Sequence, residues 1–302
     1  MPLQKRIPIL AVAMVGLVML ISACSQPTST GSNSSSSLSV GQVLQKSANA
    51  MKQLKSSHVD LQSTTNVQTS GGTATTGTSS AATPTAQNVS VQVKGNGDQQ
   101  LPDQEQLNLT LNNTTNVAEI LQGNKVYVKN NQGKWYVLDK ATLQNSVGNP
   151  FSGFTIDQSS LLGLLQNIKL TDHGTESLNG VSLRHITAQL DKTALEQLLN
   201  SDPQLKNTFG SQNIDTVLNN TKTFLSTADV WIDETNFYVH RSELKVNLAA
   251  DTSAVGNGAP TSVKTALDLI VDLSKFNDPV TITPPTNATP TNNPAAVLGN
   301  MP

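Results

Sequence analysis

Apolar residues recur three and four positions apart between Val40 and Leu54, with lysine and glutamine residues between them. This spacing predicts an amphipathic helix with one buried face. From His58 onward the period changes to two, so that Val59 and Leu61 point to one side and His58 and Asp60 to the other. An alternation of this kind is typical of a half-buried strand. The sequence therefore predicts a first helix that leads directly into a first strand.

Further alternating or short apolar segments, bounded by turn residues, predict a series of strands. They cover about 89–93, 107–111, 117–121, 125–129, 134–138, 170–178, 181–190, 228–233, 237–249 and 264–273. Gly123-Asn124 and Asn179-Gly180 separate neighbouring strands and are typical of tight hairpins. Most strands are therefore expected to be antiparallel to their neighbours.

The middle of the chain is expected to be helical again. The segment from Leu161 to Ile168 is too densely apolar for a solvated strand, and Asp157 before it is a suitable N-cap. Another helix is expected from Asp191 through Leu199, and a third around 214–225. One helix, a run of strands, a helical interlude and further strands predict an α+β fold with helices against one face of a curved antiparallel sheet.

The N-terminus has the layout of an export signal. Lys5 and Arg6 precede an apolar run over 7–21 that ends in Ser22, Ala23 and Cys24, so residues 1–23 are interpreted as a signal peptide. The run is shorter than the roughly 20 residues that cross a bilayer, which makes a permanent membrane span the weaker interpretation. Cys24 is the only cysteine, which excludes an intramolecular disulfide or a CxxC site.

The segment Ile21-Ser22-Ala23-Cys24 resembles the lipobox of bacterial lipoproteins. The resemblance implies cleavage before Cys24 and a diacylglyceryl group on its thiol, and two acyl chains give stable anchoring. The alternative is a cysteine that happens to end a signal peptide cut elsewhere. The expected location is the extracytoplasmic face of a cell membrane, at the cell surface or in the periplasm.

Low-complexity segments set the expected domain boundaries. Residues 24–37 have no large apolar residue and are expected to form a flexible tether. Residues 69–87, mostly Thr, Ser, Gly and Ala, are expected to be a disordered insert, and 284–302, with five prolines, a disordered tail. One domain over 38–283 remains.

Composition and motifs exclude several classes of function. The net charge of -2 and the 13% of charged residues offer no basic surface for nucleic acid. The four histidines are scattered, and no metal-binding, nucleotide-binding or hydrolase motif surrounds them. The acidic residues around Trp231 are interpreted first as part of a hairpin turn. We therefore expect neither catalysis nor a metal or cofactor.

Landmarks along nearly the whole domain resemble the LppX/LprG-type bacterial lipoproteins, which share the half-barrel fold of the lipoprotein carrier LolA. The landmarks are the helix-to-strand junction 48–58, Gly123-Asn-Lys-Val-Tyr-Val128 with Trp135, Leu161 to Leu165, 173–180, 191–198, Asp229-Val-Trp-Ile-Asp-Glu-Thr235 and 273–280. The resemblance implies helices packed on the concave face of the sheet, and between them a cavity that relatives use for the acyl chains of lipids or glycolipids.

Such a cavity needs apolar walls and few polar groups. Its candidate lining residues are Val59, Leu61, Leu109, Leu111, Val126, Val128, Leu161, Leu164 and Leu165. Each could equally belong to a solid core, because alternation marks only the buried face of a strand.

Two functions stay open at this level. The first is a membrane-anchored lipoprotein that binds lipid acyl chains for transport or shielding at the cell envelope. The second is an envelope sensor or scaffold of the same fold, which contacts a partner protein and carries no lipid.

Overall fold

A computed structural model describes residues 38–72, 85–144, 158–165, 168–201, 218–251, 261–293 and 297. The expected signal peptide, Cys24 and the tether lie outside the described residues, as do Asp157 and most of the low-complexity insert. Leu38, the first described residue, also begins the compact unit of the chain.

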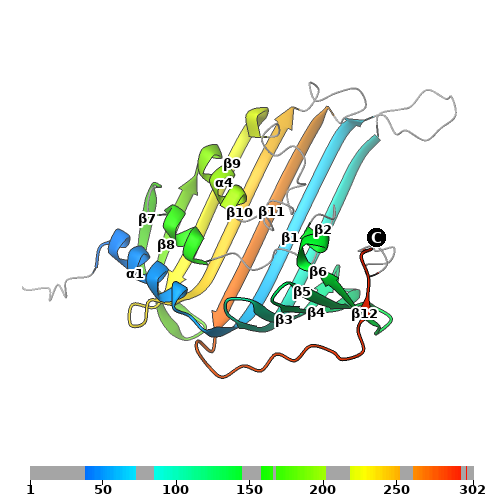
Figure 1. Cartoon of the computed structure of the whole chain (residues 1–302). Helices are drawn as coiled ribbons and strands as arrows, with labels where there is room; N and C mark the ends of the chain where they lie inside the picture. Colours follow the sequence, from blue (N-terminus) through cyan, green and yellow to red (C-terminus); the bar gives the residue numbers. More distant parts are fainter. Residues whose placement is uncertain are drawn as a thin grey trace, which may run out of the picture. The chain divides into compact units, whose positions relative to one another are not determined.

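The described part is built on one large, curved and unclosed sheet of twelve strands (Figure 1). The strand order is β12-β6-β5-β4-β3-β2-β1-β11-β10-β9-β8-β7. Neighbours are antiparallel, except that β12 runs parallel to β6. The sheet is thus mixed at one edge, whereas the sequence predicted an antiparallel sheet. The predicted α+β class, a curved sheet with helices packed on its concave face, is confirmed.

Strands β5, β7 and β8 have the predicted bounds, whereas β1 to β4, β9 and β11 are longer than the apolar patterns indicated. Their bounds are β1 Ser56–Gly72, β2 Thr85–Gln100, β3 Gln104–Leu111, β4 Thr115–Gln122, β5 Lys125–Lys129, β6 Trp135–Asp139, β7 Leu170–Leu178, β8 Val181–Leu190, β9 Thr221–Ile232, β10 Val239–Asp251, β11 Ser262–Ser274 and β12 Thr289–Pro290. Four helices accompany them in the described residues: α1 Val40–Lys52, α2 Lys140–Gln144, α3 Gln158–Leu165 and α4 Lys192–Ser201.

Helix α1 has the buried face that its spacing predicted. Val43, Leu44 and Met51 are buried on it. Its N-terminus is a capping box, in which Ser39 Oγ accepts from Gln42 N–H and Ser39 N–H donates to Gln42 Oε1. Helix α1 packs on α3, and α3 contacts α4. These helices lie over the sheet in Figure 1.

The core lies between the helices and the concave face of the sheet. Alternate residues of the central strands are buried there, for example Leu267, Leu269 and Val271 of β11. Buried side chains at every second position are the same alternation that predicted the strands. The curved sheet therefore presents an almost continuous apolar wall to the helices.

Three predictions about the boundaries need correction. The helix expected around 214–225 is wrong from Thr221 onward, because these residues form β9 and pair with β10. The insert expected at 69–87 contributes strand residues at both ends, since β1 continues to Gly72 and β2 begins at Thr85. Strand pairing satisfies backbone groups even where the side chains are small and polar.

The expected disordered tail is also ordered in part. Thr289 and Pro290 pair with Tyr136 and Val137 of β6, and Thr291 N–H donates to the Val137 carbonyl oxygen. Val297 is 2% exposed in the apolar core. This segment covers the edge of β6, whose unpaired backbone groups would otherwise face water.

Two glycines let strands β2 and β3 approach closely. A Cβ on Gly97 would collide with the backbone carbonyl of Gln106, whereas a Cβ on Gly95 would meet only the side-chain ends of Leu109 and Leu61. Backbone atoms cannot move aside as side-chain ends can. Gly97 is therefore required by close packing of the two strands.

We expect Gly97→Ala to lower the free energy of unfolding by about 2 kcal/mol, as overpacking does. Gly95→Ala is the matched control, with a smaller loss because leucine side chains can rotate. Urea denaturation of both variants measures the difference. Equal losses in the two variants would contradict the backbone collision.

Candidate functional site

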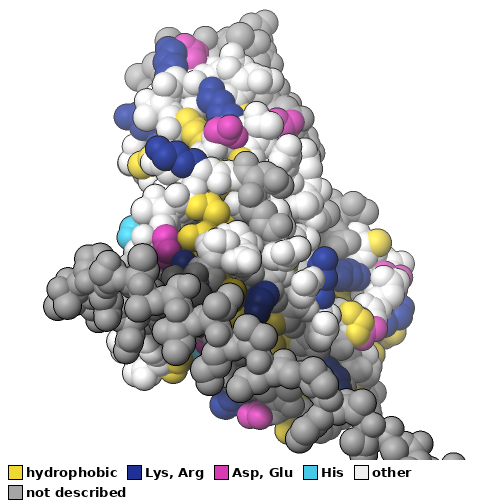
Figure 2. Space-filling model, turned by 90° about the vertical axis from the view of Figure 1, so that its left-hand side faces the viewer, with side chains coloured by type: hydrophobic (Ala, Val, Ile, Leu, Met, Phe, Trp, Pro, Cys, Tyr) yellow, Lys and Arg dark blue, Asp and Glu magenta, His cyan; other side chains and the backbone are white. Residues whose placement is uncertain are grey.

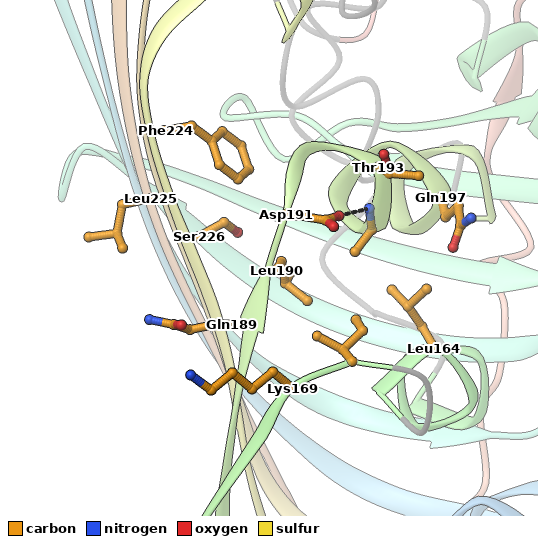
Figure 3. Close-up of a pocket in the computed structure, with 12 residues that line it drawn as sticks. Leu164, Lys169, Gln189, Leu190, Asp191, Thr193, Gln197, Phe224, Leu225 and Ser226 are labelled. Carbon is orange, nitrogen blue, oxygen red and sulfur yellow. Dashed lines mark hydrogen bonds between the residues drawn. The ribbon is translucent and has the colours of Figure 1, made fainter.

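A pocket of about 650 Å³ lies between α3, α4 and the adjoining ends of β8 and β9 (Figure 3). It is lined by Leu164, Ile168, Lys169, Gln189, Leu190, Asp191, Thr193, Ala194, Gln197, Phe224, Leu225 and Ser226. Its volume falls within the roughly 300–1,000 Å³ of ligand-binding pockets in general.

The pocket exists because β7 is shorter than its neighbour at this end. Strand β7 begins at Leu170, opposite Ala188, while β8 continues to Leu190. At Asp191 the chain leaves the sheet and enters α4, and Asp191 Oδ1 accepts from Ala194 N–H at 2.7 Å as an N-cap. The end of β8 and the start of α4 therefore form one corner of the pocket.

The lining side chains lie on both sides of the sheet edge. Leu190, Phe224 and the Ser226 hydroxyl point toward the side where α3 and α4 lie, as Figure 3 shows. The Lys169 ammonium and the Gln189 amide point to the opposite side of the sheet. The helix side of the pocket is mixed, because Thr193 and Gln197 of α4 also lie there, and the apolar Leu225 lies on the outer side.

Ser226 is the unusual residue of the inner wall. It is 2% exposed, and its Oγ has no hydrogen-bond partner in the part of the chain that the structure describes. Its neighbours on the same face of β9 are Ala228, Val230 and Ile232, each fully buried. The buried face of β9 is therefore apolar except for this one unsatisfied hydroxyl.

The residues predicted from the sequence to line a cavity are mostly in the packed interior. Eight of them are buried with exposed fractions of 0% to 8%: Val59, Leu61, Leu109, Leu111, Val126, Val128, Leu161 and Leu165. Leu164 is the member of the predicted set that lines the pocket between α3 and α4. The remaining lining residues come from β8, β9 and α4, which sequence patterns did not single out as a group.

A second polar feature lies on the concave face, in strands β3 and β4. Glu105 and Glu119 occupy inward positions, in register with Leu121 and Leu107. Both side chains keep some exposed surface, yet Glu105 Oε1 and Glu119 Oε2 are buried without a hydrogen-bond partner among the described residues.

Burial governs the ionisation of this pair. Desolvation raises the pKa of Glu105 from 4.5 to about 7, although the charge of Lys140 acts in the opposite direction. Desolvation, then the neighbouring charge of Glu105, raises the pKa of Glu119 well above its usual range. Burial therefore disfavours the ionised form of both carboxyl groups.

His58 and His185 contact side chains of neighbouring strands. His58 Nδ1 lies 2.6 Å from Asp98 Oδ1, and His185 lies between Glu176 and Asp229. The His185 ring stacks on Trp231 with ring centroids 4.2 Å apart. No group of three potential metal ligands occurs within the described ranges. These contacts connect neighbouring strands, as cross-strand pairs do in other sheets.

The face of the molecule shown in Figure 2 has no single dominant charge. Figure 2 views the left-hand side of Figure 1, where α1, β7 and β8 lie. Lysine and arginine side chains are interspersed there with acidic ones, and apolar side chains appear in separate groups. No helix among the described residues is long and apolar enough to cross a membrane.

Comparison with solved structures finds lipoproteins of the type that the sequence resembles. The chain is similar to lipoprotein LppX of Mycobacterium tuberculosis, with 17% identity, a TM-score of 0.40, and coverage of 80% of this chain and 97% of that one. It is similar to LprF of Mycobacterium bovis, with 16% identity, a TM-score of 0.39 and coverage of 81% and 96%.

A domain assigned to outer membrane lipoprotein sorting from Vibrio parahaemolyticus is more distant. Its identity is 6%, its TM-score 0.25, and the coverage 80% of this chain and 93% of that one. No family model matches the sequence, and no curated protein matches it.

Proposed function

We propose that this protein is an exported lipoprotein that holds a lipid acyl chain in the pocket between α3, α4 and the ends of β8 and β9. The observation that carries the proposal is the pocket itself, whose lining includes the apolar side chains of Leu164, Ile168, Leu190 and Phe224. Anchoring through lipidated Cys24 would place the pocket at the surface of the membrane from which the lipid comes.

The energetics of such a site are favourable without specific contacts. Each acyl CH₂ removed from water contributes about 0.8 kcal/mol. Polar lining residues such as Lys169 and Gln189 allow the head group of the lipid to stay in contact with water. Binding of this kind suits shielding or transport of a lipid rather than catalysis.

Filling the pocket tests the proposal. Leu164→Trp introduces a larger side chain into the lining and is expected to weaken binding of a fluorescent fatty acid at least tenfold. Gly163→Trp is the matched control, because Gly163 is exposed on the same helix and a Cβ there would meet nothing within 4 Å, and we expect its binding to equal that of the wild type.

Thermal unfolding by circular dichroism establishes that both variants fold. Unchanged binding in folded Leu164→Trp would contradict the assignment of the acyl chain to this pocket. Loss of binding in Gly163→Trp as well would contradict it too, because the added tryptophan would then act through something other than the filled pocket.

A further inference from the structure

A second groove lies on the convex face of the sheet, the face that points away from the helices. It has a volume of about 400 Å³ and lies near the ends of β1, β9, β10 and β11 at the top of Figure 1. Two of its lining residues, Lys264 and Ala266 of β11, are out of phase with the buried Leu267 and Leu269 and therefore point away from the core. The groove shares no lining residue with the pocket beside α3 and α4.

The pairing of the strands explains why a groove forms here. Ala266 lies between Asn66 of β1 and Asn247 of β10 in one row across the sheet. In the next row on the same face, Ala249 of β10 lies beside Lys264. A methyl group extends less far from the sheet than an amide or an ammonium side chain. The two alanines therefore form the floor of the groove, and the longer polar side chains form its walls.

The polar groups of these walls are available to a ligand. Elsewhere on the convex face polar side chains bind one another, as Arg241 does when its Nε and Nη2 donate to Asp272. Asn66, Asn247 and Lys264 are exposed, and their side chains have no hydrogen-bond or ion-pair partner within the described ranges. A ligand that enters the groove from solvent can reach all three.

The kinds of group in the groove indicate a saccharide. A side-chain amide both donates and accepts hydrogen bonds, as does the Thr223 hydroxyl, and a sugar hydroxyl uses both functions. Leu225 is 55% exposed opposite Asn247 and offers apolar surface to the C–H face of a sugar ring. Lys264 is the one charged residue in the described lining, so the charge of an acidic saccharide is complementary to that of the groove.

We propose that the convex groove binds a saccharide chain that carries carboxylates, with sugar hydroxyls bound by Asn66 and Asn247 and a carboxylate beside Lys264. The inference goes beyond lipid binding and does not depend on it, because the groove and the lipid pocket have different lining residues. It gives the protein a second ligand, which is soluble in water and binds on the other face of the sheet.

The charge of the ligand is tested with two tetrasaccharides in ligand-observed NMR titrations at low salt. Hyaluronan tetrasaccharide carries carboxylates, and chitotetraose is neutral. The protein is the full chain with Cys24→Ser, which removes the expected anchor. We expect hyaluronan tetrasaccharide to bind about fivefold more tightly than chitotetraose, the upper range for one exposed ion pair. In Lys264→Gln the two saccharides are expected to bind equally.

The place of binding is tested by filling the floor of the groove. Ala266→Phe puts a large side chain between Asn66 and Asn247, and an aromatic residue is well tolerated in a strand. We expect it to weaken binding of hyaluronan tetrasaccharide at least tenfold. Gln62→Phe is the matched control, because Gln62 is exposed in phase with Asn66 on β1 and does not line the groove. Circular dichroism establishes that both variants fold.

Several results would overturn the proposal. The first is a wild type that binds neither tetrasaccharide. The second is a preference for hyaluronan tetrasaccharide that persists in Lys264→Gln, a substitution at an exposed position that leaves the fold intact. The third is equal binding by the wild type and folded Ala266→Phe, or an equal loss in Gln62→Phe, because the saccharide would then bind elsewhere.

Discussion

Replacing Glu105 with glutamine is expected to stabilise the protein at pH 8 by at most about 3 kcal/mol and to leave its stability unchanged at pH 4. Burial raises the pKa of Glu105 from 4.5 to about 7 in the folded state. In the unfolded state the carboxyl ionises near 4.5, so above this pH the unfolded chain gains a charge that the folded protein resists. The free energy of unfolding therefore falls between about pH 4.5 and 7 and is constant above this range.

Glutamine has no such charge, so the variant should lose this part of the pH dependence. The change also removes the negative charge that raises the pKa of Glu119. Urea denaturation at several pH values measures both effects. Asp103→Asn, on an exposed turn after β2, is the control for the loss of one negative charge. A Glu105→Gln profile parallel to that of the wild type would contradict burial of an ionisable group at this site.

Replacing Arg184 with alanine is expected to lower the free energy of unfolding by about 3 kcal/mol, the typical effect of removing one partner from a buried ion pair. The Arg184 side chain is 8% exposed. Its Nη1 donates to the Leu38 carbonyl at 2.7 Å and to Glu234 at 3.0 Å, and its Nε and Nη2 donate to both carboxylate oxygens of Asp172. One guanidinium thus holds β7, β8 and the start of the domain together.

The ion pair changes the free energy of unfolding with pH in the direction opposite to that of Glu105. Hydrogen bonds from Arg184, then from the backbone N–H of Gly174, lower the pKa of Asp172 below its usual 3.8. This carboxylate contributes stability above that usual value, and the contribution disappears as the pH falls through the lowered pKa of the folded state. Arg184→Ala should therefore lose less stability between pH 5 and 2 than the wild type.

Arg184→Lys separates the charge of this residue from its geometry. Lysine keeps the positive charge but cannot form the paired contact with both oxygens of Asp172. We expect the free energy of unfolding of Arg184→Lys to lie between that of the wild type and that of Arg184→Ala. Equal stability of Arg184→Ala and the wild type in urea would contradict the structural role of this contact.

The strands were largely predictable because one face of the sheet is buried and the other is exposed. Alternation in β10 and β11 follows from this difference, and the hairpin at Asn179-Gly180 needs left-handed backbone at both residues, with φ values of 52° and 81°. The polar end of β1 and the polar starts of β2 and β9 were not predicted, because their side chains do not alternate between apolar and polar. Residues such as Thr221 and Thr223 are held by backbone pairing rather than by burial of an apolar side chain.

The pocket was harder to predict than the core. Leu164, Leu190 and Phe224 come together only through the packing of α3, β8 and β9. A periodic pattern of apolar residues in the sequence does not indicate where such packing leaves a gap. The sequence does contain a signal for the acidic pair. Glu105 is in phase with Leu107 and Leu109, and Glu119 with Val117, so alternation alone places both carboxylates on the buried face.

Native mass spectrometry of the full chain with Cys24→Ser, purified from bacteria, tests lipid binding most directly. We predict discrete mass adducts that organic extraction releases as acylated lipids, and their loss in Leu164→Trp. A single mass equal to that of the polypeptide, unchanged after incubation with phosphatidylglycerol micelles, would contradict the proposed function.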